Sequence, residues 1–136
     1  MRPLNGRSAQ RGVTLLELMA VMVIVAVLAA IAIPTYRQQV VRSNRSNAKA
    51  VITQTAQNLE RCYTRTSTFV GCVVLPVTTP EGLYAVTGEI NPTTYLLTAT
   101  PQGTQANDTA CGSFTLNEAN ARGVSGSSPP NECWSR

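Results

Sequence analysis

Glu17 is the residue whose position most needs a chemical explanation, because it is the one carboxylate in a long apolar segment. From Leu18 to Ile33, sixteen apolar residues follow without interruption, and Thr14 and Glu17 are the only polar residues between Val13 and Ile33. A carboxylate in hydrocarbon costs several kcal/mol unless it is paired or neutralised. The sequence therefore predicts that Glu17 makes a specific interaction.

Cysteine chemistry is confined to the part of the chain that follows the apolar segment. Cys62, Cys72, Cys111 and Cys133 all lie there, the chain has no histidine, and no two cysteines form a CxxC pair. We therefore predict no metal and no cofactor. An even number of cysteines in a small domain indicates disulfides and an oxidising compartment, so we expect the C-terminal part outside the inner membrane.

Neither catalysis nor nucleic-acid binding is indicated by the remaining polar residues. The chain has no histidine base, Asp108 is its single aspartate, and no serine or cysteine lies in a recognisable nucleophile motif. Three arginines before the apolar segment supply most of the formal net charge of +4, because residues 13–136 carry 8 basic and 7 acidic groups. We predict that the chain is not an enzyme, and we do not expect nucleic acid as a partner.

The apolar segment predicts a membrane span. A helix over residues 13–33 is roughly 31 Å long at a rise of about 1.5 Å per residue, which matches the hydrocarbon core of a bilayer. A basic leader ending in Gly12 precedes it, whereas a secretory signal peptide has a shorter apolar stretch followed by a small-residue cleavage site. Cleavage at Gly12 would leave the helix on the mature chain, and an uncleaved signal anchor fits this pattern about equally well. We expect a leader at 1–12, a transmembrane and assembly helix at 13–34, and a globular domain at 35–136.

Helical periodicity continues beyond Pro34, a residue that ordinarily ends or kinks a helix. The next 29 residues contain neither glycine nor proline. Five apolar residues recur there at spacings of 7, 4, 7 and 4, which places them on one helical face: Val41, Ala48, Ile52, Leu59 and Tyr63. The pattern favours one long helix over the alternative of a span, a linker and a separate helix.

The rest of the chain is typical of a loop followed by antiparallel strands. Residues 64–82 predict a loop, and Leu83–Ile90 and Thr93–Thr100 flank the turn dipeptide Asn91-Pro92 and predict a hairpin. A third strand is expected around Phe114 and Leu116, and the final stretch, residues 120–134, is expected to be an irregular loop. The predicted fold is α+β, with a long helix packed on a three- or four-stranded antiparallel sheet.

The N-terminal residues RGVTLLELMAVMVIVAVLAAIAIP resemble the start of type IV prepilins. Those proteins share a basic leader ending in glycine, an acid at the fifth mature position and a proline that closes the first half of the helix, and Gly12, Glu17 and Pro34 match these positions. The segment from Leu83 to Gly126, with the terminal Cys-Trp, is similar to minor pilins of the E type (PilE-like). Two positions depart from the family pattern: Val13 stands where phenylalanine is usual, and Ala26 stands where many relatives have glycine.

The resemblance implies a structural subunit of a type IV pilus with the type IV pilin fold. It implies cleavage between Gly12 and Val13 by prepilin peptidase, N-methylation of Val13, and pairing of Glu17 with the Val13 amine of a neighbouring subunit. The alternative for Glu17 is that its side chain reaches the membrane surface and meets water. Expected partners are other major and minor pilins, prepilin peptidase and the inner-membrane assembly machinery. Expected localisation is the inner membrane with a periplasmic C-terminal domain, and the extracellular pilus after assembly, where the subunit would support pilus biogenesis, adhesion and twitching motility.

Four cysteines allow three pairings, of which we predict Cys62–Cys72 with Cys111–Cys133. The first pair is predicted from spacing alone, because Cys72 follows the end of the helix by ten residues. The second pair is supported by the resemblance to E-type minor pilins, in which these two positions are joined. Trp134 is then expected to pack in the core or on the second disulfide.

Two other functions stay open at this point. A pilin that captures DNA or a surface would use exposed loops or the basic residues Arg37, Arg42, Arg45 and Lys49, although a solvated or subunit-facing helix surface accounts for the same residues. A pseudopilin of a type II secretion system is the other alternative. The major pseudopilins usually carry an acidic calcium loop near the C-terminus, and here the last 36 residues contain only three acids: Asp108, Glu118 and Glu132.

Overall fold

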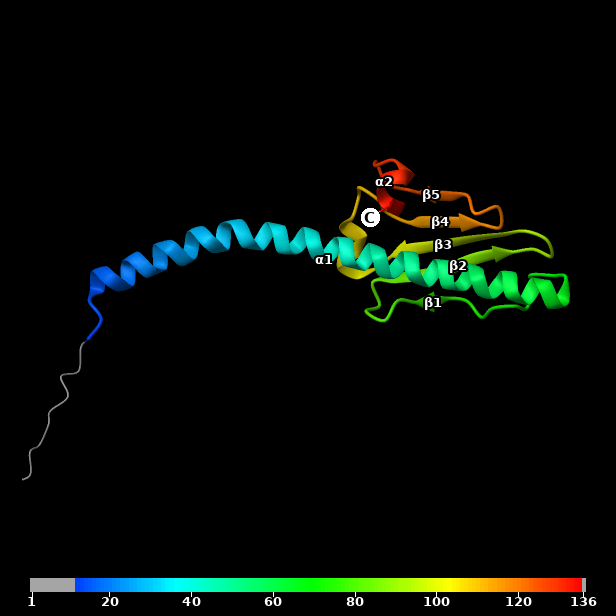
Figure 1. Cartoon of the computed structure of the whole chain (residues 1–136), viewed down its shortest axis with the longest axis horizontal. Helices are drawn as coiled ribbons and strands as arrows, with labels where there is room; N and C mark the ends of the chain where they lie inside the picture. The colour runs from blue at the N-terminus through cyan, green and yellow to red at the C-terminus, as the bar shows by residue number, and fades with distance from the viewer. Residues whose placement is uncertain (1–11, 136) are drawn as a thin grey trace, which may run out of the picture. The chain divides into compact units, whose positions relative to one another are not determined.

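One long helix followed by a small antiparallel sheet makes up the chain in the computed structural model, which describes residues 12–135 (Figure 1). The predicted leader lies outside the described residues except for Gly12. In chain order the elements are α1 (Leu15–Thr66), β1 (Val77–Thr78), β2 (Tyr84–Ile90), β3 (Tyr95–Pro101), the short 3-10 helix η1 (Gly103–Asn107), β4 (Phe114–Asn117), β5 (Arg122–Val124) and α2 (Pro130–Ser135). The architecture is α+β, as predicted.

Helix α1 runs without a break through Pro34, so the prediction of a single helix is confirmed. Proline removes one backbone donor from a helix. In the same turn the hydroxyl of Thr35 donates a hydrogen bond to the carbonyl of Ile31 at 3.1 Å. The chain divides into two compact units within this helix, after Arg37. The first unit is described below with the candidate site, and the second contains the sheet.

The sheet has five strands in the order β1-β2-β3-β4-β5, and every neighbouring pair is antiparallel. The sheet therefore has one strand more than the upper limit of the predicted three or four, and the three strands that the sequence located are the central ones. Each edge strand is too short to show alternation: β1 pairs through only two residues, Val77 with Val86 and Thr78 with Ala85. The other edge strand, β5, has Gly123 at its centre, where the Thr115 hydroxyl fills the space that a Cβ would take.

The last 15 residues of the described chain also differ from the prediction of an irregular loop. They contain β5 and the six-residue helix α2. Pro130 is the first residue of α2, a position that tolerates proline because the first backbone N–H groups of a helix have no partner within the helix. A six-residue helix is too short to show an apolar period, which is why the sequence pattern does not reveal it.

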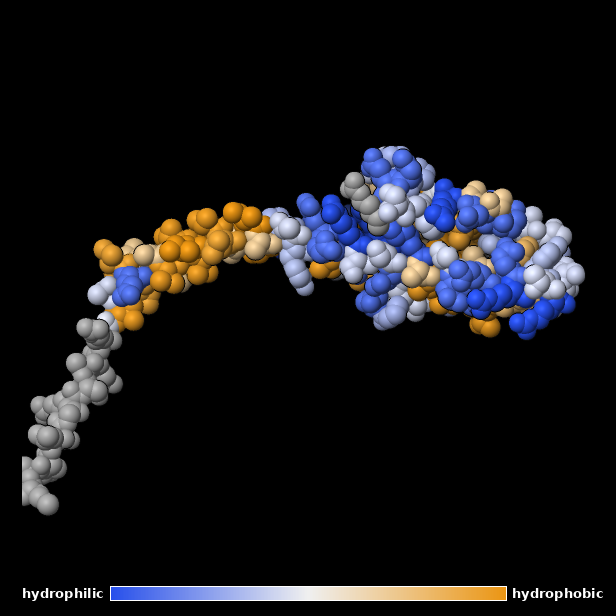
Figure 2. Space-filling view, in the orientation of Figure 1, coloured by the Kyte–Doolittle hydropathy of each residue, from blue (hydrophilic) through white to orange (hydrophobic). Residues whose placement is uncertain are grey.

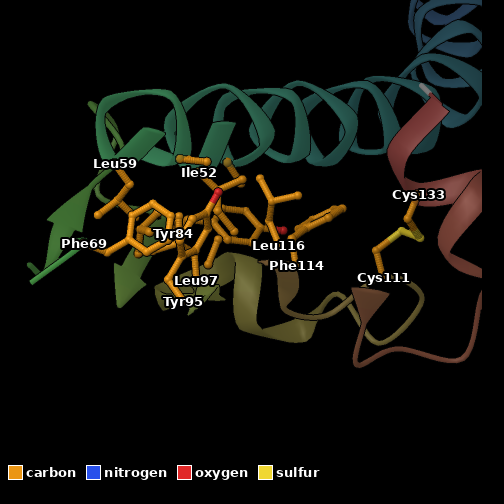
Figure 3. Packing of buried hydrophobic residues seen from close by; sticks show 14 residues of the cluster. Ile52, Leu59, Phe69, Tyr84, Tyr95, Leu97, Cys111, Phe114, Leu116 and Cys133 are labelled. Carbon is orange, nitrogen blue, oxygen red and sulfur yellow. A yellow bond between two sulfur atoms is a disulfide. The ribbon is translucent and has the colours of Figure 1, made fainter. Parts of the chain in front are cut away.

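The core lies between the second half of α1 and one face of the sheet (Figure 3). Helix α1 contributes Ala48, Ile52 and Leu59, all fully buried and all on the predicted apolar face. The sheet contributes alternate residues of its three central strands: Tyr84, Val86, Tyr95, Leu97, Ala99, Phe114 and Leu116. Strands expose alternate side chains to opposite faces, so this register sends one face of β2, β3 and β4 into the core.

Aromatic rings close the end of the core near the C-terminus of α1. Phe69 stacks on Tyr63 with ring centroids 4.4 Å apart, and it meets Tyr95 edge-on at 4.9 Å. The backbone N–H of Phe69 donates to the carbonyl of Pro92 in the β2–β3 turn at 3.0 Å. The loop that follows α1 is thereby held against both the helix and the sheet.

Candidate functional site: the N-terminal helix and its anchorage

The first turn of α1 carries the helix cap on which the candidate acid depends. The backbone N–H of Glu17 donates to the hydroxyl oxygen of Thr14 at 3.2 Å, and the N–H of Leu18 donates to the carbonyl of Thr14 at 3.1 Å. Thr14 and Glu17 thus occupy the two positions of a capping box, a helix-start signal that was legible in the sequence as T-x-x-E and was missed there. An acid in the first turn also interacts favourably with the helix dipole.

Large apolar side chains from Val13 to Ile33 are exposed along the chain. Figure 2 shows them as a continuous hydrophobic surface on the face toward the viewer. Their exposed fractions include 78% for Leu15, 62% for Leu28 and 68% for Ile31. The apolar stretch is long enough and apolar enough to cross a membrane, and within the described chain none of it is buried. A helix that is apolar all round requires lipid or other helices around it.

Glu17 is exposed on this apolar helix and has no ion-pair partner among residues 12–135. Gly12 and Val13 precede the helix and are exposed as well. The predicted processing and assembly residues, Gly12, Val13, Glu17 and Pro34, therefore all lie in the first compact unit. The four cysteines lie in the second.

Two disulfides tie the globular unit together, and they are the two pairs that we predicted. Cys62 and Cys72 are joined across a separation of 10 residues, and Cys111 and Cys133 across 22. Cys111 and Cys133 are buried, whereas Cys62 and Cys72 are half-buried. The second disulfide connects α2 to the residues immediately before β4.

Trp134 follows Cys133 in α2 and packs against the core, as expected. Its ring meets Phe114 edge-on with centroids 5.5 Å apart, and its Nε1 donates to the carbonyl of Gly123 in β5 at 3.1 Å. The Arg122 guanidinium lies over the same ring, 5.1 Å from the centroid. The tryptophan therefore joins α2 to β4 and β5 and has a structural role.

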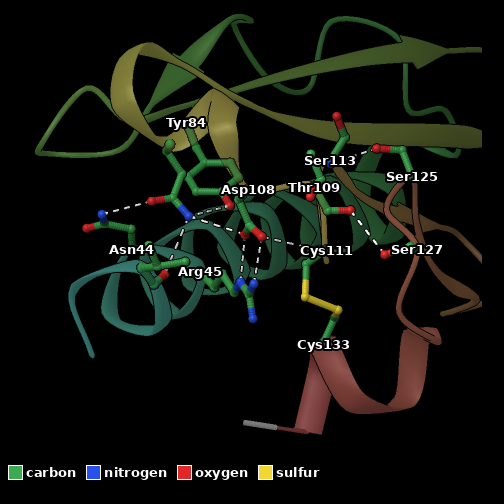
Figure 4. A network of polar contacts seen from close by, with 12 residues as sticks. Asn44, Arg45, Tyr84, Asp108, Thr109, Cys111, Ser113, Ser125, Ser127 and Cys133 are labelled. Carbon is green, nitrogen blue, oxygen red and sulfur yellow. Dashed lines mark hydrogen bonds and ion pairs between the residues drawn. A yellow bond between two sulfur atoms is a disulfide. The ribbon is translucent and has the colours of Figure 1, made fainter. Parts of the chain in front are cut away.

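A polar network fixes η1 to α1 at the start of the globular unit (Figure 4). Arg45 forms a bidentate ion pair with Asp108, with nitrogen–oxygen distances of 2.7 and 2.6 Å. Buried Gln105 accepts from the Asn44 amide at 3.0 Å and donates to the Tyr84 hydroxyl at 3.2 Å. Asn44 is a polar residue on the apolar face of α1, so the apolar period of the helix did not identify it as buried. Gln105 lies in η1, outside the predicted helix and strands, so no period identified it either.

The ion pair sets the titration of its carboxylate. Burial raises the pKa of Asp108. Three opposing effects together outweigh burial: the hydrogen bond from Arg45, the nearby backbone N–H groups and the guanidinium charge. The pKa of Asp108 therefore lies below its ordinary 3.8. Bidentate pairing with a guanidinium is among the strongest charged hydrogen-bond arrangements in proteins. Arg45, counted in the sequence among possible surface cations, is therefore committed to the fold.

We predict that Asp108→Asn lowers the free energy of unfolding by about 1–3 kcal/mol at neutral pH, because the Arg45 guanidinium loses its paired charge. A carboxylate whose folded pKa is depressed stabilises the fold above its unfolded pKa and loses that effect as the pH falls through the folded value. The difference between wild type and variant should therefore shrink below about pH 4. Thermal melting followed by circular dichroism from pH 7 to pH 2 measures it; a constant difference would contradict this account.

Comparison with known proteins covers both units. Residues 7–33 match the prokaryotic N-terminal methylation motif, and residues 34–115 match the family described as type IV minor pilin ComP, DNA uptake sequence receptor. The type IV major fimbrial protein FimA of Dichelobacter nodosus is 43% identical over 56 residues, which are 41% of this chain and 36% of FimA. The chain thus spans about a third of the length of this curated relative.

Solved structures give the same fold. A type IV pilin from Shewanella oneidensis superposes with a TM-score of 0.55 at 24% identity, covering 71% of this chain and 99% of that one. The non-core minor pilin PilV of Neisseria meningitidis superposes with a TM-score of 0.53 at 24% identity, covering 65% and 90% of the two chains. The methylation motif, the family match and the fold agree, and the chain belongs to the family of type IV minor pilins described as ComP.

Proposed function

We propose that this chain is a structural minor subunit of a type IV pilus, assembled through its N-terminal helix. The observation that carries the proposal is the apolar segment from Val13 to Ile33, whose large apolar side chains are exposed and which holds a single acid, Glu17. Such a helix is stable only in lipid or among other apolar helices. A pilin passes from lipid to a bundle of apolar helices, which accounts for the exposed apolar segment and for its single acid.

Processing prepares the helix for that transfer. Prepilin peptidase cuts between Gly12 and Val13, the leader at 1–12 is released, and Val13 receives a methyl group. Before assembly the subunit stands in the inner membrane by residues 13–34, with residues 35–136 in the periplasm, where the disulfides form. Inner-membrane assembly machinery then moves it into the fibre beside major and minor pilins, in which it supports pilus biogenesis, adhesion and twitching motility.

Within the fibre, Glu17 pairs with the Val13 amine of a neighbouring subunit. The two charges lie four residues apart in the chain, so pairing between neighbouring subunits fixes a small axial offset between them. The low dielectric of packed apolar helices strengthens such a pair and makes an unpaired Glu17 costly. Neighbouring subunits at any other axial offset would leave Glu17 unpaired.

Recovery of the chain in pili sheared from cells tests this proposal. The subunit should co-purify with the fibres, and Gly12→Arg should leave an uncut precursor in the membrane fraction. A subunit that stays in the membrane or periplasm of fully piliated cells would contradict the proposal. Gly6→Arg, a glycine replacement inside the leader, is the matched control and should not affect recovery.

DNA capture is a second candidate, favoured by the description of the matching family as a DNA uptake sequence receptor. Two cations of the globular unit are already engaged within the chain and give DNA capture little support, because Arg45 is paired with Asp108 and Arg122 lies on Trp134. Phosphate contacts by lysine and arginine produce a steep loss of affinity with salt. Binding of the full chain, in detergent, to double-stranded DNA between 50 and 200 mM salt decides: steep salt dependence favours a receptor, and no binding favours a purely structural subunit.

A further inference from the structure

A tyrosine and an arginine, Tyr36 and Arg37, follow the apolar segment of α1. Ile33 is the last residue of that segment, and Pro34 and Thr35 separate it from the pair. Tyr36 is 71% exposed, and Arg37 is exposed as well. Figure 2 shows the hydrophobic surface of α1 giving way to a polar one farther along the helix. An aromatic ring and a cation therefore lie at the end of a stretch that is apolar enough to cross a membrane.

Within the described residues 12–135, no protein group binds the side chain of Arg37. It has no ion pair and no contact with an aromatic ring, whereas Arg45 is paired with Asp108. An unpaired guanidinium suits a lipid phosphate, because the two groups can form parallel hydrogen bonds. A tyrosine ring, with an apolar body and a polar tip, is favoured in the same headgroup layer. The chemistry of this pair therefore fits the surface of a phospholipid bilayer.

The length of the helix before this pair matches the thickness of a membrane. Helix α1 begins at Leu15. At about 1.5 Å per helical residue, Arg37 lies about 33 Å farther along the helix axis. The hydrocarbon core of a bilayer is about 30 Å thick, and the whole bilayer with its headgroups is about 40–45 Å thick. With Arg37 in one headgroup layer, the start of α1 and the Gly12–Val13 peptide before it therefore lie at the opposite membrane surface.

We propose that Tyr36 and Arg37 bind the phospholipid headgroups on one side of the membrane and so fix the depth of the helix in the bilayer. This inference rests on the proposed function, in which the subunit stands in the inner membrane before assembly. The stretch from Leu18 to Ile33 is apolar throughout, so it does not by itself determine how far the helix is inserted. Interfacial tyrosine and arginine side chains determine that depth. Here they hold the Gly12–Val13 peptide at the opposite surface, within reach of prepilin peptidase.

Spin-label depth measurements on the full chain in phosphatidylglycerol vesicles test the inference. A nitroxide on Ile31→Cys reports its depth through its accessibility to oxygen and to a water-soluble nickel complex. Tyr36→Leu/Arg37→Leu extends the apolar stretch and should move the label about 3 Å deeper, which is two residues of helical rise. Tyr36→Trp/Arg37→Lys keeps an interfacial ring and a cation and should leave the label at its wild-type depth. Arg61→Leu, at an exposed cation of the globular unit, is the matched control and should also leave it there. An unchanged depth in the double leucine variant would overturn the proposal.

Vesicle composition tests the contact between Arg37 and phosphate. Arg37→Gln should move the label deeper in phosphatidylglycerol and should have no effect in digalactosyldiacylglycerol, a lipid without phosphate. No shift in phosphatidylglycerol, or equal shifts in the two lipids, would show that Arg37 does not bind phosphate. A wild-type label that lies outside the hydrocarbon would instead contradict the membrane helix, and with it the proposed function.

Discussion

Glu17→Ala is expected to reduce the amount of this subunit in sheared pili by about tenfold or more, which corresponds to the loss of at least about 1.4 kcal/mol of pairing free energy. The reason is the environment of the carboxylate. An acid on a fully apolar helix is costly in hydrocarbon, and pairing with the Val13 amine of a neighbour removes that cost. Immunoblots of equal amounts of sheared pili measure the effect.

The capping role of Glu17 requires a second variant, because the acid also lies in the first turn of α1 beside Thr14. Glu17→Gln keeps a capping-box residue and removes the charge. Thr14→Ala removes the cap, at a cost of about 0.5–2 kcal/mol to the helix start, and keeps the charge. If pairing is decisive, Gln fails like Ala while Thr14→Ala is incorporated; the reverse order would mean that capping, and not charge, controls assembly.

A matched control separates assembly from folding. Glu81 is an exposed acid of the globular unit, and Glu81→Ala should be incorporated like the wild type. Glu17 lies in the other compact unit, so Glu17→Ala should not change the melting temperature of the globular unit. A lower melting temperature for Glu17→Ala would indicate that poor recovery reflects instability.

Removing the disulfide between Cys111 and Cys133 is expected to have the larger effect on stability. A closed loop of this length stabilises by roughly 3 kcal/mol in the chain-entropy model, a large share of the total stability of a small domain. Cys111 and Cys133 are also buried, so serine at either position introduces a hydroxyl into the core. Without the bond, α2 is still held to β4 and β5 by the contacts of Trp134 with Phe114, Gly123 and Arg122.

Double serine variants make the comparison clean, because neither leaves a free thiol. The Cys62→Ser/Cys72→Ser variant opens a shorter loop at half-buried positions and should lose less stability than Cys111→Ser/Cys133→Ser. Melting temperatures of the full chains in detergent, and their abundance in the periplasm, measure the difference. An equal or larger loss for the Cys62–Cys72 pair would show that the C-terminal disulfide does not dominate.

The fold was predictable where burial follows a regular period. Ala48, Ile52 and Leu59 obey a helical period, and the central strands alternate, so the helix-on-sheet architecture followed from the sequence. The edge strands did not, because β1 has two residues and β5 is centred on Gly123, and neither gives a period to detect. The buried polar group of Asn44, Gln105 and Asp108 was missed since partners 61 and 63 residues apart leave no local pattern.

The candidate site was predictable in its residues more than in its interactions. Glu17 stood out because a carboxylate contradicts its apolar surroundings, and the resemblance to prepilins placed Gly12, Val13 and Pro34 beside it. The hydrogen bond from Glu17 to Thr14 depends on the helix beginning at Leu15, and helix boundaries are the least certain part of a sequence pattern. For the basic residues the residue type was misleading: Arg45 was grouped with the possible surface cations, whereas the structure pairs it with buried Asp108.

The central claim is that the chain is cut after Gly12 and assembled through the helix that begins there. Mass spectrometry of pili sheared from cells tests it most directly, by identifying the N-terminal peptide of this chain within the fibre fraction. The account predicts a peptide that begins at Val13 and carries a methyl group on its amine. A fibre-associated chain that begins at any other residue, or fibres that lack this chain altogether, would contradict it.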